Sequence, residues 1–189
     1  RGASTKERPF GEFDACVGGW ELPGEPFTVA PGSKFGWWRA RMVGGRTNHW
    51  GRISLRFGPD DFRRRSLDSL GDDWPISYDD LAPYYDRVDD LIGIFGSAEG
   101  LPNHPDGHFL PAPKPRCYEL LVKQACDNLK VACIPARLSI LTQPLGDRAA
   151  CHYCGQCNRG CAVNANFSST NVLIPPAMAT GHRDGVARV

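Results

Sequence analysis

Four of the eight cysteines in this chain fall within eleven residues, from Cys151 to Cys161, in the spacing Cys-x2-Cys-x2-Cys-x3-Cys. Spacings this short place all four thiols on one loop, and Gly155 and Gly160 let its backbone bend freely. Thiolates that converge from one loop are typical ligands of a metal ion or an iron–sulfur cluster. The sequence therefore predicts a metal or cluster site with the candidate ligands Cys151, Cys154, Cys157 and Cys161.

An iron–sulfur cluster is the interpretation that this spacing favours, because bacterial ferredoxin loops use the same spacing. Ala162 stands where those loops carry proline. A four-cysteine zinc site usually draws on two Cys-x-x-Cys pairs well apart in sequence, whereas here one loop holds every thiol. Disulfides at these spacings would close small, strained rings. Zinc and redox or structural thiols remain the alternatives.

The overall composition is that of a globular chain. It has 189 residues, a formal net charge of +1, 41% hydrophobic and 23% charged residues. This composition argues against disorder, and the near-neutral charge removes the usual electrostatic basis for binding nucleic acid or acidic membranes. No apolar run approaches the roughly 20 residues that span a bilayer. With 21 glycines and 16 prolines, we expect many loops.

The clearest predicted helix lies between Ser77 and Gly93. Ser77 and Asp80 match a capping box, and apolar and tyrosine residues recur at helical spacing over 81–92. Because proline interrupts a helix interior, we expect the main helix to begin at Pro83, after a short first turn. Its tyrosine-rich face is interpreted as core packing.

The remaining segments are assigned from turn residues and periodicity. The expected elements are an irregular segment over 1–36, two short extended stretches around a glycine turn over 37–57, an irregular connection over 96–115, a helix over 117–129, an extended stretch over 131–141, a short helix over 171–180 interrupted by two prolines, and a strand beginning near 185.

Several charged, histidine and cysteine residues are assigned structural roles. The basic run 63–65 is interpreted as a solvated helix face rather than a binding patch. His104 and His108 are four residues apart, but Pro105 and Gly107 exclude a helical metal pair, so surface or loop-packing roles are expected. Buried roles as small apolar side chains are expected for the scattered cysteines Cys16, Cys117, Cys126 and Cys133.

The segment around residue 45 is dense in groups that suit a large anionic, aromatic cofactor. Gly44 and Gly45 let backbone amides approach a ligand closely, and Arg46 and Thr47 add donors for phosphate oxygens. His49 and Trp50 place an imidazole and a flat aromatic ring beside them. A tight hairpin with a buried, hydrogen-bonded His49 explains the same residue types equally well. The candidate cofactor-binding residues are Val43, Gly44, Gly45, Arg46, Thr47, Asn48, His49 and Trp50.

The octapeptide from Val43 to Trp50 resembles the flavin-contacting signature of the glucose–methanol–choline (GMC) oxidoreductases, FAD enzymes that oxidise alcohols and sugars. A second segment, from Asp73-Trp-Pro-Ile-Ser to Pro83-Tyr-Tyr-Asp86, resembles one that recurs in bacterial sugar-type members. The resemblance runs from about Trp37 to Gly181. Residues 44–50 are its most specific part.

The resemblance implies roles for the octapeptide. Residues 44–47 would lie along the FAD pyrophosphate and ribityl chain, and residues 48–50 would approach the isoalloxazine ring. In some relatives a histidine at the position of His49 is bonded covalently to the flavin 8α-methyl group. The family's catalytic pair lies in a C-terminal region that has no match here, so no catalytic residue is assigned.

The family's N-terminal Gly-x-Gly-x-x-Gly motif is also absent from this sequence. Together with Arg1 at the start and Val189 at the end, this absence predicts an internal piece of a longer protein. The expected fold class is α/β, mixed α+β in this piece: a loop-rich, partial FAD-binding domain without the N-terminal Rossmann unit. Residues 1–60 would belong to the FAD-binding domain, and residues 61–189 to a helical and loop region leading into the substrate domain.

The resemblance also bears on the cysteine loop. Multi-subunit sugar dehydrogenases of the family carry a three-iron (3Fe–4S) cluster bound through Cys-x5-Cys-x3-Cys, which Cys151, Cys157 and Cys161 reproduce, leaving Cys154 as an extra thiol. Such a cluster would pass electrons singly from FAD to a cytochrome, quinone or small-subunit acceptor, which favours a dehydrogenase over an oxidase.

The expected function is therefore FAD-dependent oxidation of CH–OH groups of a sugar, polyol or other alcohol, with hydride passing to flavin N5. The rival interpretations are an iron–sulfur electron carrier and a non-catalytic binding module stabilised by zinc. The sequence does not determine the compartment. The protein is cytoplasmic or, if an export signal lies upstream, periplasmic.

Overall fold

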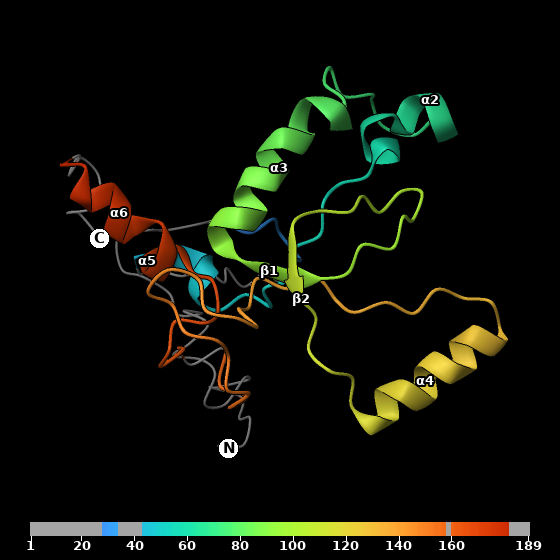
Figure 1. The fold of residues 1–189 in the computed structure, drawn as a ribbon. Coiled ribbons are helices and arrows are strands. Elements are labelled where there is room, and N and C mark those ends of the chain that lie inside the picture. The colour runs from blue at the N-terminus through green and yellow to red at the C-terminus, as the bar shows by residue number, and fades with distance from the viewer. Residues whose placement is uncertain (1–27, 34–42, 158–159, 182–189) are drawn as a thin grey trace. The chain divides into compact units, whose positions relative to one another are not determined.

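A computed structural model of the chain describes residues 28–33, 43–157 and 160–181 (Figure 1). These residues divide into two compact units. The first contains residues 28–33, 43–51, 155–157, 160–161 and 168–181, and the second contains residues 52–154 and 162–167. The elements expected in residues 1–27 and 37–42, the strand expected near residue 185, and Cys16 lie outside the described residues.

Helices and short strands occur together in the described residues. The first unit holds η2 (Gly45–Asn48), α5 (Ser169–Val172) and α6 (Ile174–Ala179). The second holds η3 (Pro59–Phe62), α2 (Arg64–Asp68), α3 (Tyr78–Ile92), β1 (Ile94–Gly96), β2 (Phe109–Pro111) and α4 (Cys117–Asn128). The mixed helix-and-strand class is therefore confirmed. No helix in the described part of the chain combines the length and apolar character needed to cross a membrane.

Helix α3 begins and ends where the capping residues predict. The Ser77 amide donates to Asp80 Oδ2 at 2.8 Å, the Asp80 amide donates to Ser77 Oγ at 3.3 Å, and Gly93 ends the helix with φ 73°. The expectation that the main helix starts at Pro83 is wrong, because α3 continues through this proline. Pro83 lies in the N-terminal half of α3. Because proline has no N–H, the helix loses one backbone hydrogen bond there.

The tyrosine-rich face of α3 packs differently from the expected apolar core. Ile92 is buried, but Tyr84 is 61% exposed and Leu91 is 53% exposed. Tyr85 stacks on Tyr78 with ring centroids 6.2 Å apart. This face therefore makes aromatic contacts, while much of its apolar surface stays uncovered in the described residues.

The segment predicted to be irregular, residues 96–115, contains a strand. β2 pairs in parallel with β1, with Phe95 opposite Leu110, and the two lie side by side in Figure 1. Phe95 also forms an antiparallel bridge with Leu138. In the expected extended stretch 131–141, only Leu138 and Ile140 form bridges. These pairings join segments far apart in sequence, so local periodicity did not reveal them.

Helix α4 agrees closely with the predicted helix over 117–129. Cys117 at its start is exposed, however, so the buried role expected for this cysteine is wrong. Cys126 and Cys133 are half-buried. The reason is that no residue of α4 is buried, and its apolar residues face solvent in the described structure.

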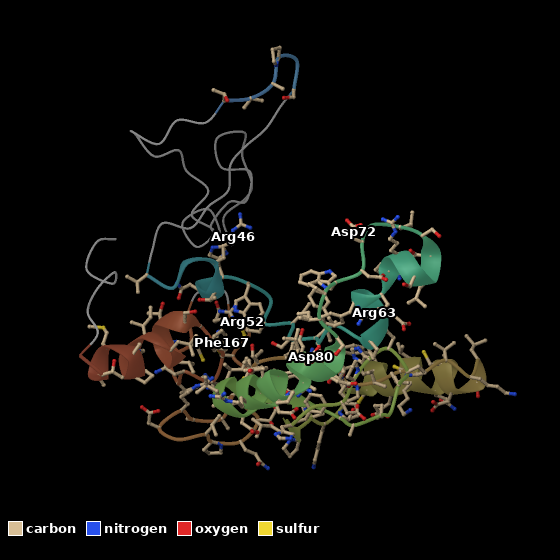
Figure 2. All side chains as sticks on the ribbon, turned by 90° about the horizontal axis from the view of Figure 1, so that it is seen from above. Arg46, Arg52, Arg63, Asp72, Asp80 and Phe167 are labelled. Atoms are coloured by element: carbon tan, nitrogen blue, oxygen red, sulfur yellow. The ribbon has the colours of Figure 1, made fainter. Side chains whose placement is uncertain are left out.

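The basic run is a solvated helix face, as predicted. Arg64 pairs with Asp68 one turn later on α2, and Arg65 Nη1 lies 3.3 Å from Asp72 Oδ1. Arg63 donates to the Trp74 carbonyl oxygen at 2.7 Å. Arg63 and Asp72 flank α2 in Figure 2. Every cation of the run thus has a local partner.

The two prolines near the C-terminus start a helix rather than interrupt one. Pro175 and Pro176 occupy the first turn of α6, where a backbone N–H would have no intrahelical partner and its absence in proline costs no helical hydrogen bond. The chain breaks at Leu173, between α5 and α6. The single interrupted helix that we expected over 171–180 is therefore two short helices.

Buried arginines join distant segments of the second unit. Arg148 donates to the Ile92 carbonyl oxygen at 2.8 Å and to the Asn164 carbonyl oxygen at 3.0 Å. Arg137 Nη2 donates to Asp106 Oδ1 at 2.9 Å. Both arginines are almost fully buried. A guanidinium carries five donors, so one side chain can satisfy carbonyl groups from several loops at once.

Arg56 forms a buried ion pair with α3. Its Nη2 lies 2.5 Å from Asp89 Oδ2 and 2.7 Å from Asp86 Oδ1. Burial alone would lower the pKa of Arg56, but the hydrogen bonds to Asp89, Asp86 and Tyr78 raise it overall. Burial raises the pKa of Asp89, while the bonds from Arg56 and the His108 amide oppose that shift. The guanidinium and the carboxylate therefore form a charged pair.

His104 and His108 have the loop roles that the sequence predicts, and we expect them to titrate on opposite sides of 6.5. His108 Nδ1 lies 3.0 Å from Asp90 Oδ2, and this bond raises the histidine pKa above 6.5. Burial, followed by the charge of Arg137, lowers the pKa of His104 below 6.5. NMR titration of the two imidazoles measures both midpoints.

The variant Asp90→Asn should return the His108 midpoint toward 6.5 and leave that of His104 in place. Since the folded pKa of His108 is raised, its contribution to stability is complete at pH values below 6.5 and is lost as the pH rises through the folded value. Equal midpoints for the two histidines would contradict this assignment.

Candidate functional site

The glycine turn opens the candidate site in the first unit. Gly44 and Gly45 adopt left-handed conformations, with φ 84° and 52°. The chain then forms the 3-10 helix η2 rather than the extended stretch expected after the turn. The Thr47 amide donates to the Gly44 carbonyl oxygen at 3.2 Å, and the His49 amide donates to that of Arg46 at 3.1 Å. These local hydrogen bonds favour the helical turn over a strand.

The Thr47 side chain ties this turn to α5. Its hydroxyl donates to the Gly44 carbonyl oxygen at 2.5 Å and accepts from the Ser169 amide at 2.9 Å. Thr47 and Ser169 are 122 residues apart in sequence. The hydroxyl that the sequence suggested for phosphate binding thus holds the turn in place.

Asn48 and Thr170 make a second connection between the turn and α5. Asn48 Nδ2 donates to the Val43 carbonyl oxygen at 2.7 Å and to that of Gly45 at 3.2 Å. Thr170 Oγ1 lies 2.8 Å from the Val43 carbonyl oxygen and 3.0 Å from Asn48 Oδ1. Sequence reasoning missed Thr170, because nothing local distinguishes it from the other hydroxyl residues around it.

The backbone at Gly45 has free space beside it within the described part of the chain. A Cβ atom added to Gly45 would have no described neighbour within 4 Å, so a ligand could approach the backbone there closely. Arg46 is exposed, and its side chain extends away from η2 in Figure 2. Val43 is 37% exposed and Trp50 is half-buried. The turn therefore presents backbone groups, a cation and part of an indole.

His49 has a buried ring nitrogen that lacks a protein partner. Its Nε2 atom is buried and makes no hydrogen bond within the described structure. A buried polar atom without a partner costs about 1–3 kcal/mol. The hairpin interpretation expects a buried His49 whose ring is hydrogen-bonded, whereas Nε2 of this ring has no partner among the described residues. It fits a ligand that supplies a polar group to the imidazole.

All four cysteines of the loop carry thiol side chains. Cys151 Sγ accepts a hydrogen bond from the Tyr153 amide at 3.3 Å, and Tyr153 has φ 58°. Cys151, Cys157 and Cys161 are half-buried, and Cys154 is exposed. Cys151 and Cys154 belong to the second unit, and the other two belong to the first. Among the described residues, no three His, Cys, Asp or Glu side chains gather closely enough to hold a metal ion. The cluster site stays a prediction.

Comparison with known proteins identifies the family. The chain is 35% identical over 144 residues to 2-methyl-1,2-propanediol dehydrogenase of Mycolicibacterium austroafricanum, a match covering 74% of this chain and 26% of that protein. It is 32% identical over 149 residues to paromamine 6'-oxidase of Streptomyces fradiae, covering 76% and 27%. Fructose dehydrogenase large subunit of Gluconobacter japonicus is 36% identical over 74 residues, covering 39% and 12%.

No family model matches the chain. These relatives are dehydrogenases and oxidases of the glucose–methanol–choline type, and this chain belongs to that family. The chain spans about a quarter of the length of the first two relatives, 26% and 27%.

The two glycines of the turn provide a matched test of its geometry. A Cβ atom at Gly44 would lie 2.2 Å from Thr170 Oγ1 and 2.9 Å from Asn48 Nδ2, whereas one at Gly45 would meet no atom of the described residues within 4 Å. Left-handed strain costs about 1–2 kcal/mol in either variant, and overpacking adds about 1–3 kcal/mol for Gly44→Ala alone. Gly44→Ala should therefore lower the free energy of unfolding more than Gly45→Ala, as measured by urea denaturation. Equal losses would show that Thr170 does not pack against the turn.

Proposed function

We propose that this chain is the part of an FAD-dependent oxidoreductase that carries flavin contacts, and that the enzyme oxidises CH–OH groups of an alcohol or sugar. The observation that carries the proposal is the buried His49 Nε2, which has no hydrogen-bond partner among the residues that the structure describes, beside a glycine turn that they leave open. The names of the relatives support the reaction class, since two are dehydrogenases and one is an oxidase.

The proposed contacts divide between backbone and side chains. The open backbone at Gly45 and the exposed Arg46 would face the FAD pyrophosphate, where amide donors and a cation match anionic oxygens. Thr47 and Asn48 contribute chiefly by shaping the turn, because α5 engages their polar atoms. His49 and Trp50 would lie against the isoalloxazine ring, with His49 Nε2 directed at a polar edge or at the 8α-methyl group.

The chemistry that bound FAD supplies is acceptance of hydride at flavin N5 from the carbon that bears the substrate hydroxyl. The residues of this chain bind and orient the cofactor for that step. No residue here is assigned as the base that takes the hydroxyl proton. A separate subunit is proposed as the electron acceptor, which the name "large subunit" of one relative supports.

The substitution His49→Phe tests the flavin contact. Phenylalanine keeps a flat ring but has no ring nitrogen, so the melting temperature of the apo protein should not fall, because His49 Nε2 has no partner to lose among the described residues. Loss of one hydrogen bond should weaken FAD binding about tenfold, by roughly 1–1.5 kcal/mol. Flavin fluorescence titration and thermal melts with and without FAD measure both effects.

His152→Phe, at an exposed position outside the turn, is the control and should bind FAD as the wild type does. If His49→Phe lowers the melting temperature without FAD and leaves FAD binding unchanged, the hairpin interpretation is correct instead. Acid extraction of flavin from the wild type shows whether His49 is covalently linked, since a tethered flavin stays with the precipitated protein.

We also propose that the cysteine loop binds an iron–sulfur cluster, with Cys151, Cys157 and Cys161 as ligands. The support is the spacing of the loop and its resemblance to sugar dehydrogenases of the family. The hydrogen bond from the Tyr153 amide to Cys151 Sγ is of the kind that stabilises ligating sulfur. Since the described residues show no gathered ligand set, no electron-transfer step is derived through a cluster.

Analysis of anaerobically purified protein for iron, zinc and acid-labile sulfide tests the cluster. We expect iron and sulfide together, and we expect Cys157→Ser to abolish both. Cys154→Ser should keep them if three cysteines suffice, and Cys117→Ser is the control outside the loop. Zinc without sulfide would contradict the cluster while leaving the flavin proposal intact.

A further inference from the structure

The C-terminal end of α4 folds back on itself. The Lys130 amide donates to the Asp127 carbonyl oxygen at 3.1 Å, and the Val131 amide donates to the Cys126 carbonyl oxygen at 2.9 Å. Lys130 adopts the left-handed conformation, with φ 56°. This pair of bonds is a Schellman motif, which reverses the chain direction at a helix end. The residues after Val131 therefore return alongside the last turn of α4.

The reversal brings two half-buried cysteines together. Cys133, two residues after Val131, lies within hydrogen-bonding reach of the Cys126 thiol. Burial raises the pKa of Cys126, and the neighbouring Cys133 raises it further. The two residues lie outside the four-cysteine loop and outside the glycine turn. Nothing in the proposed flavin function uses them.

Lys123 lies near both thiols. Its Nζ lies 3.1 Å from Asp127 Oδ1, and its ammonium interacts electrostatically with Cys126 and with Cys133. The thiolate is the attacking species in thiol–disulfide exchange, and either of the two sulfurs can attack first.

We propose that Cys126 and Cys133 form a redox-active dithiol, which a small-molecule disulfide such as oxidised glutathione converts to an intramolecular disulfide. One of the two thiols loses its proton, and its thiolate attacks one sulfur of the oxidant, forms a mixed disulfide and releases one glutathione thiolate. The other thiol then loses its proton and attacks the protein sulfur of that mixed disulfide, which releases the second glutathione thiolate. The protein dithiol loses two electrons and two protons, and the oxidant gains both.

The disulfide would link the last turn of α4 to the segment that follows it. It closes a loop from residue 126 to residue 133, across a turn that backbone hydrogen bonds already hold. Little chain ordering is needed to form the bond, because the Schellman motif sets the separation of the two residues. Cys117, at the other end of α4, has no such arrangement and supplies an internal comparison.

Trypsin provides a direct test, because Lys130 lies between the two cysteines. The reduced protein is equilibrated with mixtures of reduced and oxidised glutathione, blocked with an alkylating agent at low pH, and digested. Cleavage after Lys123, Lys130 and Arg137 gives one peptide over 124–130 and one over 131–137. We expect mass spectrometry to find these two peptides joined by a disulfide, while Cys117 in peptide 117–123 is alkylated or glutathionylated.

Two variants complete the experiment. In Cys133→Ser the joined peptide should vanish and Cys126 should be recovered alkylated, while Cys117→Ser should leave the joined peptide unchanged. The proposal is overturned if wild-type Cys126 and Cys133 stay alkylated under conditions that glutathionylate Cys117, or if Cys126 pairs equally with Cys117. Neither result bears on FAD binding.

Discussion

Buried guanidinium groups hold the second unit together. Its strands are only three residues long, so the sheet supplies little of the pairing that usually joins distant segments. Arg56, Arg137 and Arg148 take over that role, each donating to backbone carbonyls or carboxylates of segments far along the chain. Removing one partner of a buried ion pair such as Arg56–Asp89 typically costs about 3–5 kcal/mol, because the other charge is left buried and unpaired. The fold of this unit thus depends on polar groups being satisfied, more than on a large apolar core.

The same principle operates in the first unit on a smaller scale. The glycine turn pairs with no strand in the described residues, and the side chains of Thr47, Asn48 and Thr170 fix its conformation. Two of these residues belong to the turn itself, and the third comes from α5, 122 residues later than Asn48. The hydrogen bonds from α5 and those within the turn together hold the left-handed glycines in place.

The sequence predicted local features well and tertiary ones poorly. The capping residues Ser77 and Gly93 located α3, because a capping box and a terminal glycine act within one turn of helix. The parallel pairing of β1 with β2 and the role of Thr170 were missed, because both depend on contacts between segments distant in sequence. The exposure of Cys117 was also missed. The spacing of apolar residues in α4 indicates which side of the helix is apolar, but it does not indicate whether another segment packs on that side.

The hydrogen bonds of Thr47 and Asn48 change the interpretation of the octapeptide. Polar side chains in a motif are easily assigned to a ligand, yet here their atoms are occupied by the turn and by α5. The groups left for a ligand are the open backbone at Gly45 and the buried His49 Nε2, which has no partner among the described residues. A nucleotide-linked ring system with anionic and polar edges meets both requirements, whereas a purely apolar ligand would leave the imidazole nitrogen unsatisfied. The unsatisfied nitrogen therefore constrains the chemistry of the ligand more tightly than the motif does.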